Sequence, residues 1–372
     1  MYRHKENISP KSMYRHKVEY IVNIDIYKTY RKYRNILEGK IRRKVMVKEL
    51  YKDIYSFEVV LPNSPLKYIN IYVIKGKKRS LVLDTGYNHK ISKDSITEGL
   101  KEIGLEISDV DLFITHLHSD HSGLSAYFED NGSKVYASEI DSVSINEMAG
   151  DEYWNRMIDW TSAYGMKEDE IKITDNPGFS YRLDHTVNFH TLKPKDIIEI
   201  GEYKLEVVDL KGHTPGHIGL YEEKNKILFC GDTVLEKITP NITYWGENNG
   251  DMLTTYIDTL EKLKKMDINH CFSTHRKQVK DYKKRIDEII NHHHMRLDEI
   301  TAAIGEGEKC SVRDITSKIS WRIRANSFDE FPPAQKFFAS GETMAHLYKL
   351  VNENKLKKET VNGVYLFSKT TK

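Results

Sequence analysis

The chain has 372 residues, of which 39% are apolar, and its 57 Lys and Arg against 55 Asp and Glu leave a formal net charge of +2. No uninterrupted apolar run approaches the roughly 18 to 20 residues of a membrane span, and the polar, basic start lacks the apolar stretch of a secretory signal; a cytoplasmic protein is therefore expected. The three cysteines lie far apart without a CxxC pair, so the sequence suggests neither a disulfide framework nor a thiolate zinc site.

Residues 1–46 are expected to form a basic N-terminal extension. Between Met1 and Lys44, thirteen Lys and Arg stand against four acidic residues, and the pentapeptide MYRHK occurs twice, starting at Met1 and at Met13. A repeat this short cannot be a structural solenoid. Two interpretations stay open: a native basic tail that contacts anionic partners, or an extension in which residues 1–12 are not native and Met13 is the natural start.

Residues 47–291 are expected to form the main domain, of the α/β class, because strands and helices alternate along them. The expected strands, rich in β-branched and aromatic residues, lie within 53–62, 68–86, 110–115 and 134–138. Helices are expected at 92–104 and 122–130. In the first of these, Ile96, Leu100 and Ile103 share one face, and Gly104 is typical of a helix end.

Residues 139–180 differ, because Trp154, Trp160 and several methionines stand among charges at helix-like intervals. These side chains either pack against the domain or belong to a lid. Further along, the expected elements are strands with tight turns over 191–235, a helix at 252–266, a strand at 270–274 and a charged helix from Lys280 past His294.

The motif THLHSDHSG, residues 115–123, places three histidines and an aspartate in six positions. His116 and His118, two residues apart just after a strand, turn their imidazoles to one side of a loop. Asp120 and His121, at the start of the next helix, face the same pocket. Imidazole and carboxylate are zinc ligands, and zinc usually takes four, so more donors must come from elsewhere in the chain.

Three more donors stand where a predicted strand meets a loop: His213 in LKGHTPGH, Asp232 in ILFCGDT and His275 in HCFSTH. We expect two ions. The first is held by His116, His118 and His213. The second is held by Asp120, His121 and His275. Asp232 is expected to bridge the two, whereas His217 braces the turn that carries His213.

This order of motifs, HxHxDH followed by an isolated His, an Asp and a last His, resembles the metallo-beta-lactamase superfamily over roughly residues 47–291. The resemblance implies an αββα sandwich, counted as α/β or α+β, with a dinuclear site at one edge. It also implies that Asp84, in LVLDTG, supports the metal loop without binding the ions. In the flavodiiron branch the second motif position is Glu and the chemistry is redox; here it is His118, which favours hydrolysis.

Two divalent ions about 3.5 to 4 Å apart lower the pKa of a shared water and polarise the group that is attacked, so a metal-bridging hydroxide is the expected nucleophile. Asp120 is the expected catalytic side chain, which orients the nucleophile or carries a proton to the leaving group. Zinc is the ion we expect, although these ligands also suit iron or manganese.

A small-molecule substrate is expected, and four side chains are candidates for binding it. Tyr244 and Trp245, after Asp232, either flank the entrance of the site or pack inside. His293 and Arg296, on the helix after the last metal motif, either line the pocket or belong to a solvated face. Glyoxalase II-like members (hydroxyacylglutathione hydrolases) carry basic residues for a glutathione carboxylate, which we cannot align here.

Residues 292–372 are expected to form a small winged-helix-like domain, with helices at 296–305, 312–320 and 340–356 and a hairpin that turns at Asn362–Gly363. A similar domain follows the metal fold in superfamily hydrolases that resemble β-lactamase-like protein 2. From Met295 onward 13 basic residues stand against 10 acidic ones, and the third helix lacks a basic face. Packing or a homodimer is therefore expected ahead of nucleic-acid binding.

These observations predict a cytoplasmic, dinuclear metal-dependent hydrolase that attacks a small thioester, ester or lactone carbonyl. The alternative is an endoribonuclease-like RNA or DNA phosphodiesterase, which the basic N-terminus and the winged-helix-like tail suggest. A third hypothesis is a binding module that uses the metal fold only as a scaffold. Seven convergent donors argue against it, because a scaffold does not need them.

Overall fold

The computed structural model describes residues 45–370, and the described residues from Met46 onward belong to one compact unit. The MYRHK repeat and nearly all of the expected basic extension lie outside the described residues. In the part of the chain that is described, none of the helices combines the length and apolar character needed to cross a membrane.

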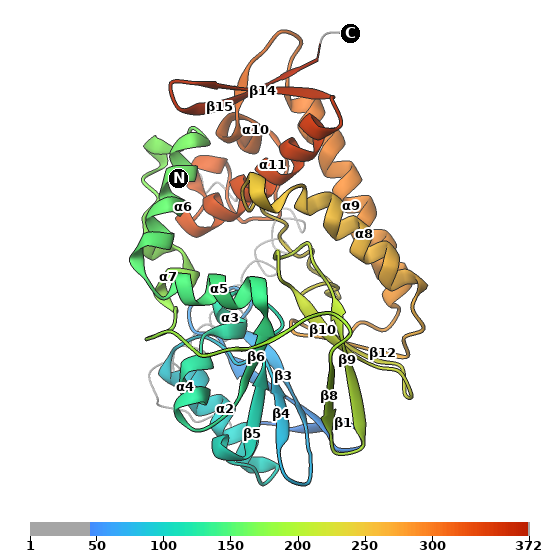
Figure 1. Cartoon of the computed structure of the whole chain (residues 1–372). Helices are drawn as coiled ribbons and strands as arrows, with labels where there is room; N and C mark the ends of the chain where they lie inside the picture. The colour runs from blue at the N-terminus through green and yellow to red at the C-terminus, as the bar shows by residue number, and fades with distance from the viewer. Residues whose placement is uncertain (1–44, 371–372) are drawn as a thin grey trace, which may run out of the picture. The chain divides into compact units, whose positions relative to one another are not determined.

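The first sheet has seven strands in the order of the chain, β1 to β7 (Figure 1). The first four form an antiparallel meander: β1 Lys48–Tyr51, β2 Ile54–Val60, β3 Tyr68–Ile74 and β4 Ser80–Leu83. The others continue parallel to β4: β5 Val110–Phe113, β6 Val135–Ser138 and β7 His190–Leu192. The strands expected within 53–62 and 68–86 are confirmed as β2, β3 and β4, whereas β1 was not expected. The parallel half brings the carboxyl ends of β4 and β5 together.

The second sheet has five strands in the order β12-β11-β10-β9-β8. Their bounds are β8 Ile197–Ile200, β9 Tyr203–Asp209, β10 Ile218–Glu222, β11 Ile227–Gly231 and β12 His270–Ser273. Neighbours are antiparallel except β11 and β12, which run parallel. The carboxyl ends of these two strands therefore lie at the same edge.

The two sheets pack face to face through one apolar layer. Tyr72 and Phe113 of the first sheet meet Phe229 and Phe272 of the second, and the rings of Tyr72 and Phe272 stack at 5.4 Å. Residues alternate across a strand with period two, so β11 sends Phe229 into this layer and Cys230 to the opposite side.

Helices cover the outer face of each sheet. Against the first lie α2 (Lys90–Glu102), α4 (Ser125–Asp130) and α5 (Glu139–Met148). Against the second lie α8 (Met252–Lys265) and α9 (Tyr282–Ala303), whose apolar side chains share a core with Leu228 and Cys230. This order of layers is the predicted αββα sandwich (Figure 1). Short helical turns complete it: α3 Ser119–Ser122, η1 Ile107–Asp109 and η4 Glu247–Asn249.

The segment 151–180 is helical, as its spacing predicts. It contains α6 Asp151–Ala163, η2 Lys167–Asp169, η3 Ile173–Asp175 and α7 Pro177–Ser180. Trp154 is buried, donates its indole N–H to the carbonyl of Met148 at 2.8 Å and lies against Phe179. These contacts are those of a packed segment, and a lid function stays a prediction.

The C-terminal part contains β13 Cys310–Ser311, α10 Val312–Lys318, η5 Phe328–Glu330, α11 Pro333–Asn352, β14 Leu356–Val361 and β15 Val364–Lys369. The strands form a sheet in the order β13-β15-β14. Asn362 and Gly363 both have positive φ, 51° and 83°, as a type I′ hairpin turn requires, so the predicted hairpin is confirmed.

Two helix predictions in this part were wrong in their bounds. The helix expected from Lys280 past His294 and the helix expected at 296–305 are one helix, α9, because no Gly or Pro interrupts the chain between them. The helix expected from residue 340 begins at Pro333, and Gly341 lies inside it instead of at its start. The predicted domain boundary at 291/292 falls inside α9, so the division into domains, like the winged-helix description, stays a prediction.

Candidate metal centre

Several predicted ligands, and the supporting residue Asp84, stand where strands end. Asp84 directly follows β4 and Asp232 directly follows β11, while His116 comes three residues after β5 and His275 two residues after β12. His213 lies in the turn from β9 to β10. Parallel neighbours bring these ends to one edge of each sheet, and the sandwich brings the two edges together.

All seven predicted ligands gather into three groups whose potential ligand atoms lie within 4.8 Å of one another. One group is His116, His118 and His213. Another is Asp120, His121 and His275. The third is His116, His121 and Asp232. The first two groups coincide with the sets expected for two ions, and the third contains His116 of the one, His121 of the other and Asp232.

The carboxylate of Asp232 lies at the centre of this arrangement. Its Oδ2 is 3.7 Å from Nε2 of His213, 3.7 Å from Nε2 of His121 and 3.6 Å from Nε2 of His275. One oxygen therefore faces nitrogens from both expected ion sets. Its other oxygen accepts a hydrogen bond from the hydroxyl of Thr274, which holds the carboxylate in place.

Outer partners orient the histidine rings. Nδ1 of His213 lies 2.9 Å from the carbonyl oxygen of Asn241, and Nδ1 of His275 lies 3.3 Å from that of Tyr68. A carbonyl only accepts, so each Nδ1 carries the proton and each Nε2 keeps a free lone pair. Nε2 of both rings is buried without a hydrogen-bond partner, as is Nε2 of His121.

Asp84 contacts the metal loop as the resemblance implied. It accepts hydrogen bonds from the backbone N–H of Thr115 at 2.8 Å and from Nδ1 of His121 at 2.9 Å. Its φ of 62° is unusual for a residue other than glycine. Carboxylates in this place fix the tautomer of a metal-binding imidazole and raise its basicity.

His118 and Asp120 are held in the protonation states that bind cations. Burial lowers the pKa of His118 to about 3, and His213 adds to the effect. Burial would raise the pKa of Asp120, but His121 and His275 lower it to about 2. Neutral imidazoles and ionised carboxylates are the ligand forms of zinc and similar ions.

Burial alone would also lower the pKa of His121, but Asp84, Asp120 and Asp232 hold it well above its usual value. A divalent cation bound here would relieve this excess of carboxylate charge and displace the proton. The orphaned Nε2 atoms, the paired outer nitrogens and the donor types together fit divalent metal binding.

Comparisons with known families agree with this geometry. A family model described as "Metallo-beta-lactamase superfamily" matches residues 65–275, more than half of the chain. The chain belongs to the metallo-beta-lactamase superfamily. A second model, "Metallo-beta-lactamase-like, C-terminal domain", matches residues 328–370.

Relatives of known name support the same assignment. The "Acyl-coenzyme A thioesterase MBLAC2" of Gallus gallus is 29% identical over 178 residues, which is 45% of this chain and 58% of that protein. The "Probable metallo-hydrolase YqjP" of Bacillus subtilis is 23% identical over 80% of this chain and 91% of its own length. A "Beta-lactamase-like protein 2 homolog" of Caenorhabditis elegans is 21% identical over 70% of this chain and 74% of its own.

Among solved structures, a metallo-beta-lactamase family protein from Thermus thermophilus has the same fold. Its TM-score is 0.72 at 24% identity, over 87% of this chain and all of that one. The predicted fold, family and enzyme class, a superfamily hydrolase, are thereby confirmed. The match to the MBLAC2 proteins spans little more than half of their length, so the reaction itself is a matter for proposal.

One residue of this superfamily site was missed by sequence reasoning. Asp141 is 1% exposed and accepts hydrogen bonds from the backbone N–H of Leu117 at 2.9 Å, from the hydroxyl of Thr214 at 2.7 Å and from the backbone N–H of Gly216 at 2.8 Å. It thus ties the His116–His118 loop to the turn that carries His213. In the sequence it stands three residues after Ser138, a spacing typical of helix capping, which hides this role.

His217 braces its turn, as expected. Its Nδ1 lies 3.2 Å from the carbonyl oxygen of Leu210 and 3.1 Å from Oγ1 of Thr233. A Cβ at Gly231 would stand 2.4 Å from Nε2 of His217, and φ at this glycine is 51°. Only glycine therefore fits the turn that leads into Asp232.

The four candidate substrate side chains separate into two groups. Trp245 is partly exposed, and its ring centroid lies 6.2 Å from that of His118. The other three are buried: Tyr244 beside Trp160 and Tyr348, His293 at 3.1 Å from His346, and Arg296 over the ring of Trp321. Substrate contact at these three positions stays a prediction.

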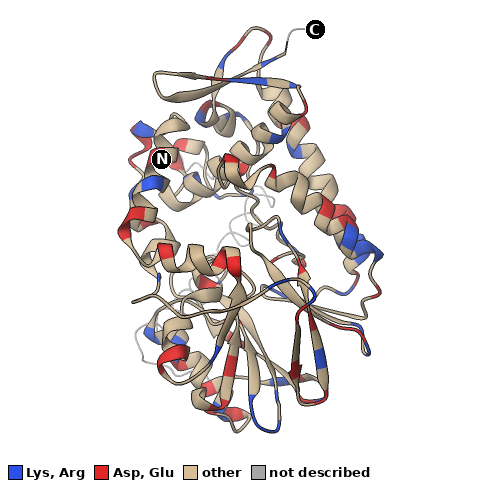
Figure 2. Cartoon of the chain, viewed as in Figure 1, with Lys and Arg blue, Asp and Glu red and all other residues tan. Residues whose placement is uncertain are grey.

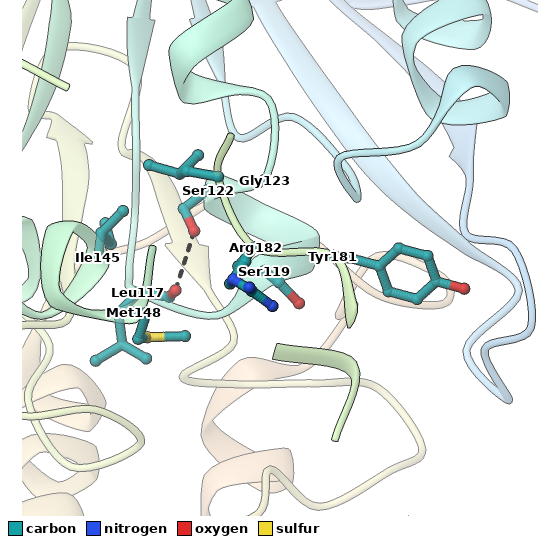
Figure 3. A pocket seen from close by; sticks show the side chains of 9 residues that line it. Leu117, Ser119, Ser122, Gly123, Ile145, Met148, Tyr181 and Arg182 are labelled. Atoms are coloured by element: carbon teal, nitrogen blue, oxygen red, sulfur yellow. Dashed lines mark hydrogen bonds between the residues drawn. The ribbon is translucent and has the colours of Figure 1, made fainter. Parts of the chain in front are cut away.

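A small cavity of about 10 Å³ lies behind the metal loop (Figure 3). It is lined by Leu117, Ser119, Ser122, Gly123, Ile145, Met148, Tyr181, Arg182 and Leu183. Leu117 and Ser119 alternate along the loop with the candidate ligands His116, His118 and Asp120. The hydroxyl of Ser122 donates to the carbonyl of Leu117 at 3.0 Å, so this side of the loop is held by its own hydrogen bonds and packing.

Proposed function

We propose that the protein is a dinuclear, metal-dependent thioester hydrolase. The observation that carries the proposal is the position of Asp232 Oδ2, 3.6 to 3.7 Å from three Nε2 atoms that belong to two separate groups of donors. A single carboxylate between two ligand sets is what a pair of divalent ions requires. In this proposal the two ligand sets are those that the sequence predicts, and zinc is the ion.

The ions would lower the pKa of a water molecule and polarise the carbonyl oxygen of the substrate. Around them the chain supplies fixed groups. Asp120 Oδ2 lies 3.2 Å from Nε2 of His275 and is partly reachable by solvent, so it can orient water or carry a proton to the leaving thiolate. Trp245, beside His118, presents a partly exposed aromatic face to a substrate.

A thioester of coenzyme A is the substrate class we propose to test first. The MBLAC2 relatives bear the name acyl-coenzyme A thioesterase, and the family model that matches this chain spans residues 65–275, which include the metal motifs. Water would add to the thioester carbonyl, the carbon–sulfur bond would break, and a carboxylic acid and a thiol would result.

The test combines metal analysis with a substrate panel. Purified wild-type protein should contain close to two divalent ions per chain and hydrolyse one or more acyl-coenzyme A thioesters. Asp232→Asn should lose more than about 100-fold in kcat/KM, since removing only an outer partner of a metal ligand typically costs 10 to 100-fold. The panel also holds simple esters, lactones and a single-stranded oligonucleotide.

Asp258→Asn is the matched control, because Asp258 is an exposed carboxylate on α8. It should keep the metal content and activity of the wild type. Full activity of Asp232→Asn would refute the proposed mechanism. Cleavage of the oligonucleotide alone would replace the thioesterase proposal with the phosphodiesterase alternative.

A further inference from the structure

Helix α11 presses against the loop that follows Asp232. A Cβ at Gly341 would stand 2.2 Å from Oγ1 of Thr243, so the helix backbone and the loop are in direct contact. The backbone N–H of Tyr244 donates to the carbonyl of Gly341 at 3.3 Å. A helix more than 90 residues along the chain from this loop thus determines where the loop lies.

Asn241, in the same loop, connects α11 to the metal centre. Its carbonyl oxygen is the partner of Nδ1 of His213, at 2.9 Å. Its side-chain Nδ2 donates to the carbonyl of Phe338 at 3.2 Å and to Oε2 of Glu342 at 3.1 Å. Both side-chain bonds of Asn241 therefore end on α11, while its backbone orients the ring of a candidate metal ligand.

Glu342 is only 9% exposed and has a second polar neighbour. Its Oε1 lies 3.6 Å from Nε of Arg296, which α9 supplies and which donates to the carbonyl of Ser320 at 2.6 Å. Burial raises the pKa of Glu342 to about 7, although Arg296 and Asn241 act in the opposite direction. An apolar side chain at position 342 would avoid the cost of desolvating a carboxylate. The hydrogen bond to Asn241 therefore explains the presence of Glu342 better than a contribution to stability does.

We propose that Glu342 is a positioning residue for the metal centre, acting through Asn241 on the ring of His213. The proposal rests on the proposed function only in that His213 binds a cation. Outer partners of metal-binding histidines fix the tautomer and the direction of the ring. Here the outer partner is a backbone carbonyl, and a side chain of the C-terminal helix holds that carbonyl in place.

The experiment compares full-length Glu342→Ala and Glu342→Gln with the wild type by two measurements. Chelator competition gives the metal affinity. Nitrogen-15 NMR of histidine-labelled, metal-free protein reports the Nδ1–H tautomer of His213 and its exchange with solvent. In Glu342→Ala we expect the affinity of one of the two ions to fall about 10-fold and the His213 Nδ1–H signal to lose its protection from exchange. Glu342→Gln, which keeps an acceptor oxygen, should recover most of both.

The matched control is Asp169→Asn. Asp169 is a buried carboxylate that pairs with Lys336 of α11 and Arg313 of α10, each at 2.7 Å, and has no bond to Asn241. The substitution Asp169→Asn weakens the packing of the same helix at a point distant from the loop. It should therefore leave the His213 signal and the metal affinity close to those of the wild type.

Two results would overturn the proposal. One is a Glu342→Ala variant whose metal affinity and His213 signal match the wild type. The other is an Asp169→Asn variant that changes both as much as Glu342→Ala, because the effect would then be general loosening. If wild-type protein binds no metal, the proposed function fails by itself, while the NMR signal of His213 still decides whether Glu342 positions the ring.

Discussion

At the scale of single residues, three buried carboxylates near the centre differ in their surroundings. Asp120 and Asp232 face histidines, which outweigh burial and keep the pKa of each below its usual value. Asp141 has no cationic partner in contact and accepts only neutral hydrogen bonds. Burial therefore raises the pKa of Asp141 to about 6, from a usual value of 3.8.

This raised pKa predicts a pH dependence of stability. Between pH 3.8 and about 6 the folded state binds the proton of Asp141 more tightly than the unfolded state, so the contribution of this group is lost as pH rises through that window. At 1.36 kcal/mol per pKa unit the loss is at most about 3 kcal/mol. Asp141→Asn lacks the titrating group, so the stability of the wild type relative to this variant should fall between pH 4 and pH 7.

Urea unfolding of metal-free protein at several pH values measures this difference. Working without metal removes the separate pH dependence of ion binding. A stability difference between wild type and Asp141→Asn that stays constant with pH would show that Asp141 titrates alike in both states.

At the scale of secondary-structure elements, the tight contact between α11 and the loop after Asp232 explains why position 341 is a glycine. Glycine inside a helix is less favourable than alanine by about 1 kcal/mol, so its presence at this position needs a compensating cause. The cause is that the backbone of α11 at Gly341 lies against the side chain of Thr243, which leaves no space for a Cβ.

We expect Gly341→Ala to lower the free energy of unfolding by up to about 2 kcal/mol, because overpacking typically costs 1 to 3 kcal/mol against a gain of about 1 from helix propensity. Adding Thr243→Ala removes the Oγ1 atom and should restore most of the loss. Urea unfolding of the two single variants and the double variant measures the coupling. A stability gain in Gly341→Ala alone would contradict the close contact.

The element predictions that failed did so where local signals were weak. The sequence around Met295 has neither a stop nor a cap, so two expected helices are one, α9. Glycine has a low helix propensity, so Gly341 favours the end of a helix. Helix α11 nevertheless continues through Gly341, because tertiary packing stabilises the helix at this position. The strands were predicted well, because their apolar alternation and their turn residues are local signals.

At the scale of the whole molecule, one apolar core joins the sandwich to the C-terminal part. Leu253 and Ile286 of α8 and α9 share it with Met344 and Leu347 of α11 and with Phe367 of β15. Each fully buried side chain of this size contributes about 1.5 to 3 kcal/mol relative to exposure. A handful of them equals the whole stability of a typical domain, about 5 to 15 kcal/mol.

A chain that ends at Gly305 should therefore fail to fold cooperatively. It loses about a third of the buried residues of this core, and it loses the helix that holds Asn241. We expect it to be insoluble, or to unfold without a sharp transition by circular dichroism, and to retain no bound metal. A fragment that unfolds sharply and holds two ions would instead support the predicted division of the chain near residue 291.

The charge distribution bears on the nucleic-acid alternative. Lys336 and Lys349 of α11 pair with Asp169 and Glu353, at 2.7 and 2.9 Å, and most of the helix is buried. Over the described residues, Lys and Arg are interspersed with Asp and Glu (Figure 2), and α11 itself carries only Lys336 and Lys349 as Lys or Arg residues. This helix is thus used for packing, as the sequence favours, whereas a homodimer stays a prediction.

The sequence by itself determined most strands of the sandwich and the seven candidate ligands, because apolar alternation marks the strands and the ligands stand in short motifs that follow them. Only the tertiary structure decided what holds those ligands in place. Asp141 meets Gly216 across 75 positions, and Asn241 meets Glu342 across 101. Partners this far apart produce no recognisable pattern in the sequence. Packing between distant elements, and not local conformation, brings each carboxylate to the groups that it positions.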